Sequence, residues 1–176
     1  MAERDSGEYA FEETSPDVHE EAHVSRGATL VGDVRVERDA SVWPGVVLRG
    51  DVAPVVVGAE SAVGDNAVLH ASEVGDRAMV GHGAVLNEAT VEDGALVGFN
   101  ATVNSGVVVG ERSIVAAGTV FPEEVHVPAE SFVRGVPARI SPLSETTIDT
   151  EEIFEAYHSG RYADLASRHE ELFDRA

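Results

Sequence analysis

Aliphatic residues recur at intervals of six positions through most of this chain, separated by small and polar residues. The series begins at residue 24, tolerates a few changes of spacing and continues to residue 133. A period of six matches neither an α-helix nor a heptad coiled coil. It indicates a parallel β-helix, in which each hexad supplies a short strand and a corner and the stacked coils bury the aliphatic column. The first members of the series are Val24, Leu30, Val36, Val42 and Leu48.

The spacing of the hexads predicts the size of the solenoid. Three hexads make one triangular coil, so residues about 18 positions apart are expected to stack at the strand spacing of about 4.8 Å. Residues 22–143 therefore predict an all-β solenoid, a parallel β-helix of about six coils. The series expands by three residues near positions 50–54 and contracts by one residue on two later occasions. These changes decide which residues share a column.

The two ends of the chain lack the six-residue pattern. Residues 1–21 are acidic and are expected to be loosely ordered. Further on, Asp149 and Glu152 have the spacing of a capping box that opens a helix, and a second helical stretch follows. Residues 144–176 therefore predict a helical segment that packs on the solenoid or on a neighbouring subunit. The predicted apolar face of its first helix comprises Ile153, Phe154 and Tyr157.

The composition excludes several kinds of partner. The formal net charge is −20, the 12 basic residues are all arginine, and cysteine is absent. This negative field repels phosphate backbones, so nucleic acid is not expected to bind. Any metal must be held by imidazole, carboxylate or amide groups because there are no thiolates.

The same composition predicts where the protein works. No apolar run approaches the roughly 20 residues that span a bilayer, and the acidic N-terminus does not resemble a signal peptide, so no membrane association is expected and a cytoplasmic protein is predicted. An acidic surface without lysine is the expected adaptation to a salt-filled cytoplasm, which indicates a halophilic organism. The alternative is a mesophilic protein that happens to be acidic.

A column of polar residues follows one row of the aliphatic repeat. Two leucines three hexads apart immediately precede His70 and Asn87, which are therefore predicted to stack at one corner of the solenoid. One coil further in each direction, the same column holds Arg49 and Asn104. We expect this column to form and organise a site rather than to fill a surface.

His82 lies on a different face, in a column with Asp65. A hexad of extended chain covers at most about 20 Å, whereas zinc needs its ligands about 2 Å away. One chain therefore does not easily bring His82 to His70. A closed ring of three subunits can do so, if the His82 corner of one chain faces the His70 and Asn87 corner of the next. The alternative is that the two histidines are unrelated corner residues.

Four segments and the C-terminal helix that follows them resemble the gamma-class carbonic anhydrase family: "ASVWPGVVLRGD" (40–51), "VLH" (68–70), "VGHGAVLN" (80–87) and "VRGVPARI" (133–140). The resemblance implies a left-handed β-helix and a homotrimer. It also implies zinc, iron or cobalt between subunits, held by three histidines. In this chain the first ligand corresponds to His70 and the second to His82, and the third falls on Asn87.

Two positions depart from the family pattern. Asn87 offers a neutral amide oxygen, which is a poor zinc ligand compared with imidazole. Gly64 stands where the family has a glutamine that hydrogen-bonds the metal-bound water. Both changes affect the chemistry that the resemblance implies, so metal binding could be weak or absent.

The resemblance also implies roles for further residues. Arg49 and Asp51 are expected to pair across the subunit interface, and Asp65 is retained beside the second ligand. Glu73, or alternatively Glu88, is a candidate for the part of the proton-shuttling glutamate found in some members, and the alternative is that each is a solvated corner charge. The predicted catalytic set is thus Asp65 and Glu73 together with the altered ligand.

Three functions remain open from the sequence. The first is reversible hydration of carbon dioxide to bicarbonate at an intersubunit metal site. The second is acyl transfer from coenzyme A, although the chain lacks the basic groups and the long loop typical of that class. The third is a non-catalytic trimeric scaffold that keeps a decayed site.

Overall fold

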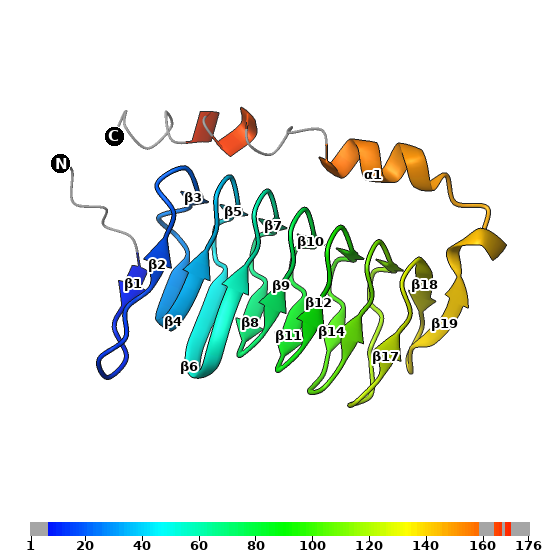
Figure 1. Cartoon of the computed structure of the whole chain (residues 1–176), viewed down its shortest axis with the longest axis horizontal. Helices are drawn as coiled ribbons and strands as arrows, with labels where there is room; N and C mark the ends of the chain where they lie inside the picture. The colour runs from blue at the N-terminus through cyan, green and yellow to red at the C-terminus, as the bar shows by residue number, and fades with distance from the viewer. Residues whose placement is uncertain (1–6, 159–163, 167, 170–176) are drawn as a thin grey trace.

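The computed structural model describes residues 7–158, 164–166 and 168–169 of the chain. Their short strands stack into a left-handed parallel β-helix with three faces (Figure 1). The predicted all-β solenoid is confirmed. It has about seven turns, where the hexads predicted about six.

Each face is a ladder of strands from successive turns. Face A contains β1 (Gly7–Tyr9), the N-terminal parts of β4 (Thr29–Val36) and β6 (Val47–Val57), β8 (Val68–His70), β11 (Val85–Asn87) and β14 (Thr102–Val103). Face B contains β2 (Asp17–Val18), the C-terminal parts of β4 and β6, β9 (Glu73–Val74), β12 (Thr90–Val91), β15 (Val108–Val109) and β17 (His126–Val127). Face C contains β3 (His23–Val24), β5 (Ser41–Val42), β7 (Ala62–Val63), β10 (Met79–Val80), β13 (Leu96–Val97), β16 (Ile114–Val115), β18 (Ser131–Arg134) and the antiparallel β19 (Arg139–Pro142).

The register of these ladders places residues of successive turns directly over one another. Leu69 of β8 pairs with Leu48 of β6 on one side and with Leu86 of β11 on the other. The same two steps separate Arg49 from His70 by 21 residues and His70 from Asn87 by 17. The longer step belongs to β6, which runs round the corner between faces A and B and whose register with β4 shifts there.

Aliphatic side chains from all three faces fill the interior. The leucines of the face A column and Phe121 are fully buried, at 0% exposure. Removing a side chain of this size from water stabilises the fold by about 1.5–3 kcal/mol. The period-six pattern therefore corresponds to one continuous apolar column. Its leucines are Leu30, Leu48, Leu69 and Leu86.

The corner that precedes face A has left-handed backbone in four successive turns. Gly45, Asn66, Gly83 and Asn100 occupy this corner with φ values of 75°, 59°, 69° and 54°. Glycine and asparagine adopt this conformation at lower cost than other residues. The corner therefore has a fixed shape, which sets the start of each face A strand.

The N-terminal segment is more ordered than the sequence predicted. β1 pairs in parallel with residues 29–31 of β4, and β2 pairs with residues 35–36. Phe11 and Thr14 exchange two backbone hydrogen bonds of 2.9 and 3.0 Å between these strands. The expectation of loose order therefore does not hold for residues 7–18. Their order comes from covering the open edge of β4, which the hexad pattern does not report.

The C-terminal helix α1 (Thr150–His158) runs along the outside of face C, after the short 3-10 turn Leu143–Glu145 (Figure 1). Asp149 caps it as predicted, because its Oδ1 accepts a 3.0 Å hydrogen bond from the Glu152 backbone N–H. Phe154 is buried, and the Arg112 guanidinium lies 4.5 Å from its ring centroid. The apolar cluster beneath the helix comprises Ala62, Met79, Leu96, Ile114 and Leu143.

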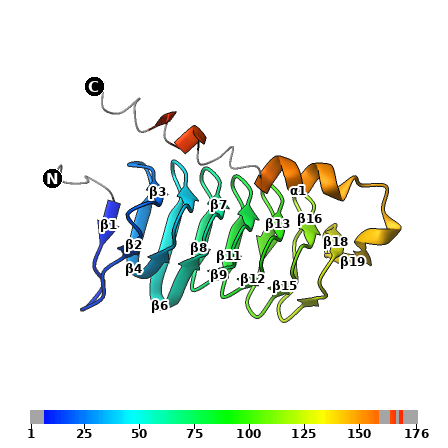
Figure 2. The same cartoon turned by 45° about the horizontal axis from the view of Figure 1, so that its top comes forward.

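Beyond α1 the described chain returns over the solenoid towards its N-terminal turns (Figure 2). Residues 164–166 and 168–169 are helical, and Ala166 is buried. The His169 ring meets the Trp43 ring edge-on, with centroids 5.1 Å apart. The rest of the predicted second helix lies outside the described residues. In the part of the chain that the structure describes, no helix is long and apolar enough to cross a membrane.

The buried column predicts a large stability difference between neighbouring residues of β11. Leu86→Ala removes a fully buried side chain and is expected to lower the free energy of unfolding by about 2–5 kcal/mol, measured by urea denaturation. Val85→Ala alters the outward-facing neighbour, which is 39% exposed, and is the matched control. Equal losses in the two variants would contradict the assignment of the column to the core.

Candidate functional site

The predicted polar column exists, and it lies at the end of the face A strands. His70 closes β8, pairs in register with Arg49 of β6 and pairs with Asn87 of β11. Its side chain is 17% exposed. The backbone ladder thus fixes His70 between a cationic and an amide side chain at a partly buried corner.

Both ring nitrogens of His70 have partners within the chain. Nδ1 lies 3.0 Å from Oδ1 of Asn87, and Nε2 lies 3.0 Å from Oδ1 of Asp51. Arg49 reaches the same group, since its Nη2 is 3.1 Å from Nε2 of His70 and its Nε donates to Oδ1 of Asp51 over 3.2 Å. The structure therefore brings these four predicted residues together in one cluster.

Asn87 is held on its other side by a residue that the sequence analysis missed. Its Nδ2 donates a 2.9 Å hydrogen bond to Oγ of Ser105, which leaves Oδ1 to face His70. The sequence spacing could have identified this residue, because Ser105 lies 18 positions, or one coil, after Asn87. Asn104 continues the backbone column but donates to the carbonyl oxygen of Phe121 at 2.7 Å.

The surroundings of Asp51 lower the pKa of its carboxyl group. Desolvation acts to raise this pKa. The hydrogen bond from His70, the hydrogen bond from the Asp51 backbone amide and the positive charges of Arg49 and His70 together outweigh that effect. The carboxylate is therefore held in its charged form beside the histidine.

The second predicted histidine lies at a separate corner, after β10 of face C. Nδ1 of His82 accepts a 2.9 Å hydrogen bond from the Asp65 backbone N–H and lies 2.8 Å from Oδ2 of Asp65. In the other tautomer, which carries a proton on Nδ1, His82 donates to the carboxylate instead. Its ring stacks on Phe99, with centroids 5.0 Å apart, and its side chain is 50% exposed. Asp65 thus orients His82 and leaves Nε2 free of this pairing.

Gly64, which replaces the glutamine of the resembled family, has a packing explanation. A Cβ atom at residue 64 would lie 2.7 Å from Nδ1 and 2.8 Å from the backbone nitrogen of His82. Real Cβ atoms do not approach other atoms so closely, so no larger side chain fits there without moving the next turn. The close stacking of these turns therefore accompanies the loss of the glutamine.

The donor groups fit a metal only in part. His70 ends a strand of face A and His82 follows a strand of face C, and each contacts its own partners. Within the described residues, no group of three histidine, cysteine, aspartate or glutamate side chains is arranged to hold a metal ion. Imidazole and carboxylate are nevertheless the donors that zinc accepts. The described residues of one chain therefore do not form a complete metal site.

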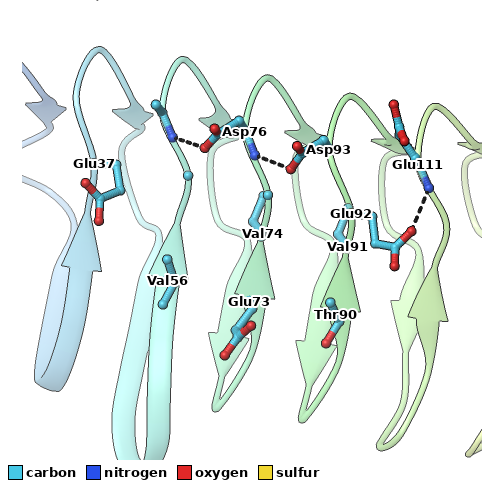
Figure 3. Close-up of a pocket in the computed structure, with 13 residues that line it drawn as sticks. Glu37, Val56, Glu73, Val74, Asp76, Thr90, Val91, Glu92, Asp93 and Glu111 are labelled. Atoms are coloured by element: carbon cyan, nitrogen blue, oxygen red, sulfur yellow. Dashed lines mark hydrogen bonds between the residues drawn. The ribbon is translucent and has the colours of Figure 1, made fainter.

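The structure places the predicted proton-shuttle residues in different surroundings. Glu73 lies on β9 and lines an acidic groove on face B, among carboxylates that include Asp76 and Asp93 (Figure 3). Its side chain is exposed and lies on a different face from the His70 strand. Glu88 directly follows Asn87, and its exposed side chain starts at the same corner as His70. The shuttle role of either residue stays a prediction.

Comparisons with known proteins connect this geometry to a family. Residues 89–121 match the model of the hexapeptide repeat of succinyl-transferase. The chain is 33% identical over 165 residues to the carnitine operon protein CaiE of Escherichia coli, which covers 91% of the chain and 83% of that protein. It is 36% identical over 166 residues to the mitochondrial gamma carbonic anhydrase 1 of Arabidopsis thaliana. That match covers 88% of the chain and 59% of the relative's length.

Solved structures agree with this fold. A Bacillus cereus protein described as a candidate acetyltransferase superposes with a TM-score of 0.87 at 26% identity, covering 94% of this chain and 97% of that one. A hexapeptide transferase family protein from Anaplasma phagocytophilum superposes with a TM-score of 0.81 at 29% identity, covering 91% and 96%. The chain belongs to the hexapeptide-repeat family, and its homologues include gamma carbonic anhydrases.

The lowered pKa of Asp51 predicts a pH-dependent contribution to stability. A carboxyl group whose pKa is lower in the folded state stabilises the fold above its unfolded pKa of about 3.9. This contribution is lost as the pH falls through the lower folded value. In chelator-treated protein we expect wild type to exceed Asp51→Asn in free energy of unfolding at pH 6, and the difference to shrink below about pH 4. A difference that grows on acidification would contradict the assignment.

Proposed function

We propose that the protein is a gamma-carbonic-anhydrase-like enzyme that hydrates carbon dioxide reversibly at a metal site between the subunits of a homotrimer. The observation that carries the proposal is a feature that the rings of His70 and His82 share. An oxygen atom faces Nδ1 of each ring, from Asn87 in one case and from Asp65 in the other. Metal-binding histidines characteristically donate one ring N–H to such an oxygen and bind the metal through the other nitrogen.

A neighbouring subunit is needed to join His70 and His82 in one site. His82 and its stacking partner Phe99 are exposed, at 50% and 45%, and aromatic side chains are enriched at subunit interfaces. A threefold ring presents one corner of each chain to a different corner of the next. In the proposed trimer, His82 of one protomer faces the cluster around His70 of its partner.

Each residue then has a defined task. A metal at this site would lower the pKa of a coordinated water to about 7, which is the chemistry that carbon dioxide hydration needs at neutral pH. Asp65 and Asn87 fix the orientation of the two imidazole rings. Arg49 pairs with Asp51 and supplies a positive charge beside the site, where a bicarbonate anion would leave. Glu73 or Glu88 would pass the released proton to solvent.

The similarity to gamma carbonic anhydrases supports the proposed enzyme class, and the composition of the chain supports a salt-rich environment. The chain spans only 59% of the length of the two Arabidopsis gamma carbonic anhydrases, so their full activity is not transferred by similarity alone. The net charge of −20 without lysine supports a salt-rich cytoplasm, in which dissolved ions screen the self-repulsion. Zinc is the metal that we propose for the site, with iron or cobalt as the alternatives.

Acyl transfer from coenzyme A is the second candidate. It is favoured by the superposition on the Bacillus cereus and Anaplasma phagocytophilum proteins, whose descriptions name transferases. The negative charge and the absence of lysine oppose it, because the cofactor carries several phosphate charges. Coenzyme A that raises the melting temperature at concentrations below about 1 mM would favour this candidate over the hydratase.

The metal site predicts a specific pattern of metal content. Wild type, His82→Ala and the control His126→Ala, which alters an exposed histidine of β17, are purified at high salt, loaded with zinc and desalted. We expect about one zinc per chain in wild type and in the control, and none in His82→Ala. Hydration of carbon dioxide, followed by stopped-flow pH change, should fall to the buffer rate in His82→Ala only. Zinc-free wild type would favour the non-catalytic scaffold.

Mixed trimers test whether the site is shared between subunits. His70→Ala and His82→Ala are each expected to be inactive alone. After unfolding and refolding together at equal amounts, roughly a quarter of the interfaces should pair an intact His70 with an intact His82. Zinc and hydration activity should return at these interfaces. No recovery in trimers of confirmed mixed composition would contradict a site shared between protomers.

A further inference from the structure

We infer that Asp51 supplies the metal ligand that Asn87 cannot, so that the site is built from His70 and Asp51 of one subunit and His82 of the next. This inference rests on the proposed metal site and specifies its ligands. It assigns Asn87 to holding the His70 ring instead of binding the metal. The reasons are the positions of these groups around His70 and the chemistry of their oxygen atoms.

Asn87 faces the nitrogen of His70 that points away from Asp51. The two ring nitrogens of an imidazole direct their lone pairs or protons to opposite sides of the ring. Asn87 lies 3.0 Å from Nδ1, and its amide group is also fixed by the hydrogen bond from Nδ2 to Ser105. A metal on Nε2 therefore lies out of reach of this amide. Asn87 instead has the outer-shell position of a group that accepts the remaining ring N–H.

Asp51 faces Nε2 at a separation suited to a shared metal. With zinc about 2.0–2.1 Å from each donor and tetrahedral angles, two ligand atoms lie about 3.3 Å apart. Oδ1 of Asp51 is 3.0 Å from Nε2 of His70, so it reaches an ion on Nε2 once the carboxylate turns sideways out of the hydrogen-bonding direction. A carboxylate is also an anionic ligand, whereas the asparagine amide is neutral.

The charges around His70 and Asp51 are compatible with binding of a metal ion by these two residues. In the metal-free chain, Nε2 of His70 lies 3.0 Å from Oδ1 of Asp51. A metal ion bound by these two groups would bring a positive charge to the Asp51 carboxylate, in place of the charge that Arg49 now supplies there. Arg49 lies 3.1 Å from Nε2 and has to move aside. Its side chain is 49% exposed, so solvent is available to receive it.

The tests use full-length trimers loaded with zinc at high salt. Removal of an outer-shell partner typically weakens metal binding about 10–100-fold, so Asn87→Ala should fall within this range. Asp51→Asn, which keeps a hydrogen-bonding side chain of the same shape, should weaken binding by more than about 100-fold. Asp93→Asn removes a carboxylate of the face B groove and is the matched control, expected to bind like wild type. Metal competition measures the affinities, and light scattering measures the mass of each trimer.

A ligand-exchange variant provides a readout that a structural role of Asp51 would not produce. X-ray absorption at the zinc edge should count two imidazoles per zinc in wild type and three in Asp51→His. The inference is overturned if Asp51→Asn trimers bind zinc as tightly as wild type, or if zinc in Asp51→His still has two imidazoles. If Asp51→Asn does not form a trimer, the imidazole count in Asp51→His decides. Zinc-free wild-type trimers would instead refute the proposed function itself, and this inference with it.

Discussion

The register of the stacked turns is the constraint on which the site depends. Parallel backbone pairing and the buried aliphatic column together allow each turn one alignment with the next, because a slip of one residue would turn the leucines outward. His70 therefore lies between Arg49 and Asn87 by virtue of turn length alone. The turn from Arg49 to His70 has 21 residues and the turn from His70 to Asn87 has 17, and these two lengths bring the three side chains together.

Much of this was readable from the sequence, because in a solenoid spatial neighbours follow from counting. The period of six predicted the fold, the apolar column and the vertical neighbours of His70. Counting failed where residues leave the ladder. Asp51 lies in the expanded corner of β6, so its approach to Nε2 depends on the path of that corner. β1 and β2 lie outside the hexad series and are ordered by pairing with the edge of β4.

The departures from the gamma carbonic anhydrase pattern have physical consequences that act together. The close approach of the turns leaves room only for glycine at residue 64, since a Cβ there would meet His82. Asn87 lacks a strong donor atom for a metal, yet its Oδ1 lies 3.0 Å from Nδ1 of His70 and holds that ring. The carboxylate of Asp51 lies on the opposite side of that ring, where a ligand is needed. In the proposed site, Asp51 takes the place of Asn87 as the third ligand, and its carboxylate supplies the donor atom that the amide lacks.

The most direct test of the shared site is an anomalous difference map, recorded at the zinc edge from crystals of the zinc-loaded protein. We expect one peak per subunit interface, about 2.0–2.2 Å from Nε2 of His70 and from Oδ1 of Asp51 in one protomer and from a ring nitrogen of His82 in its partner. Interfaces without a peak, or zinc bound only in the acidic groove of face B, would contradict a metal site shared between subunits.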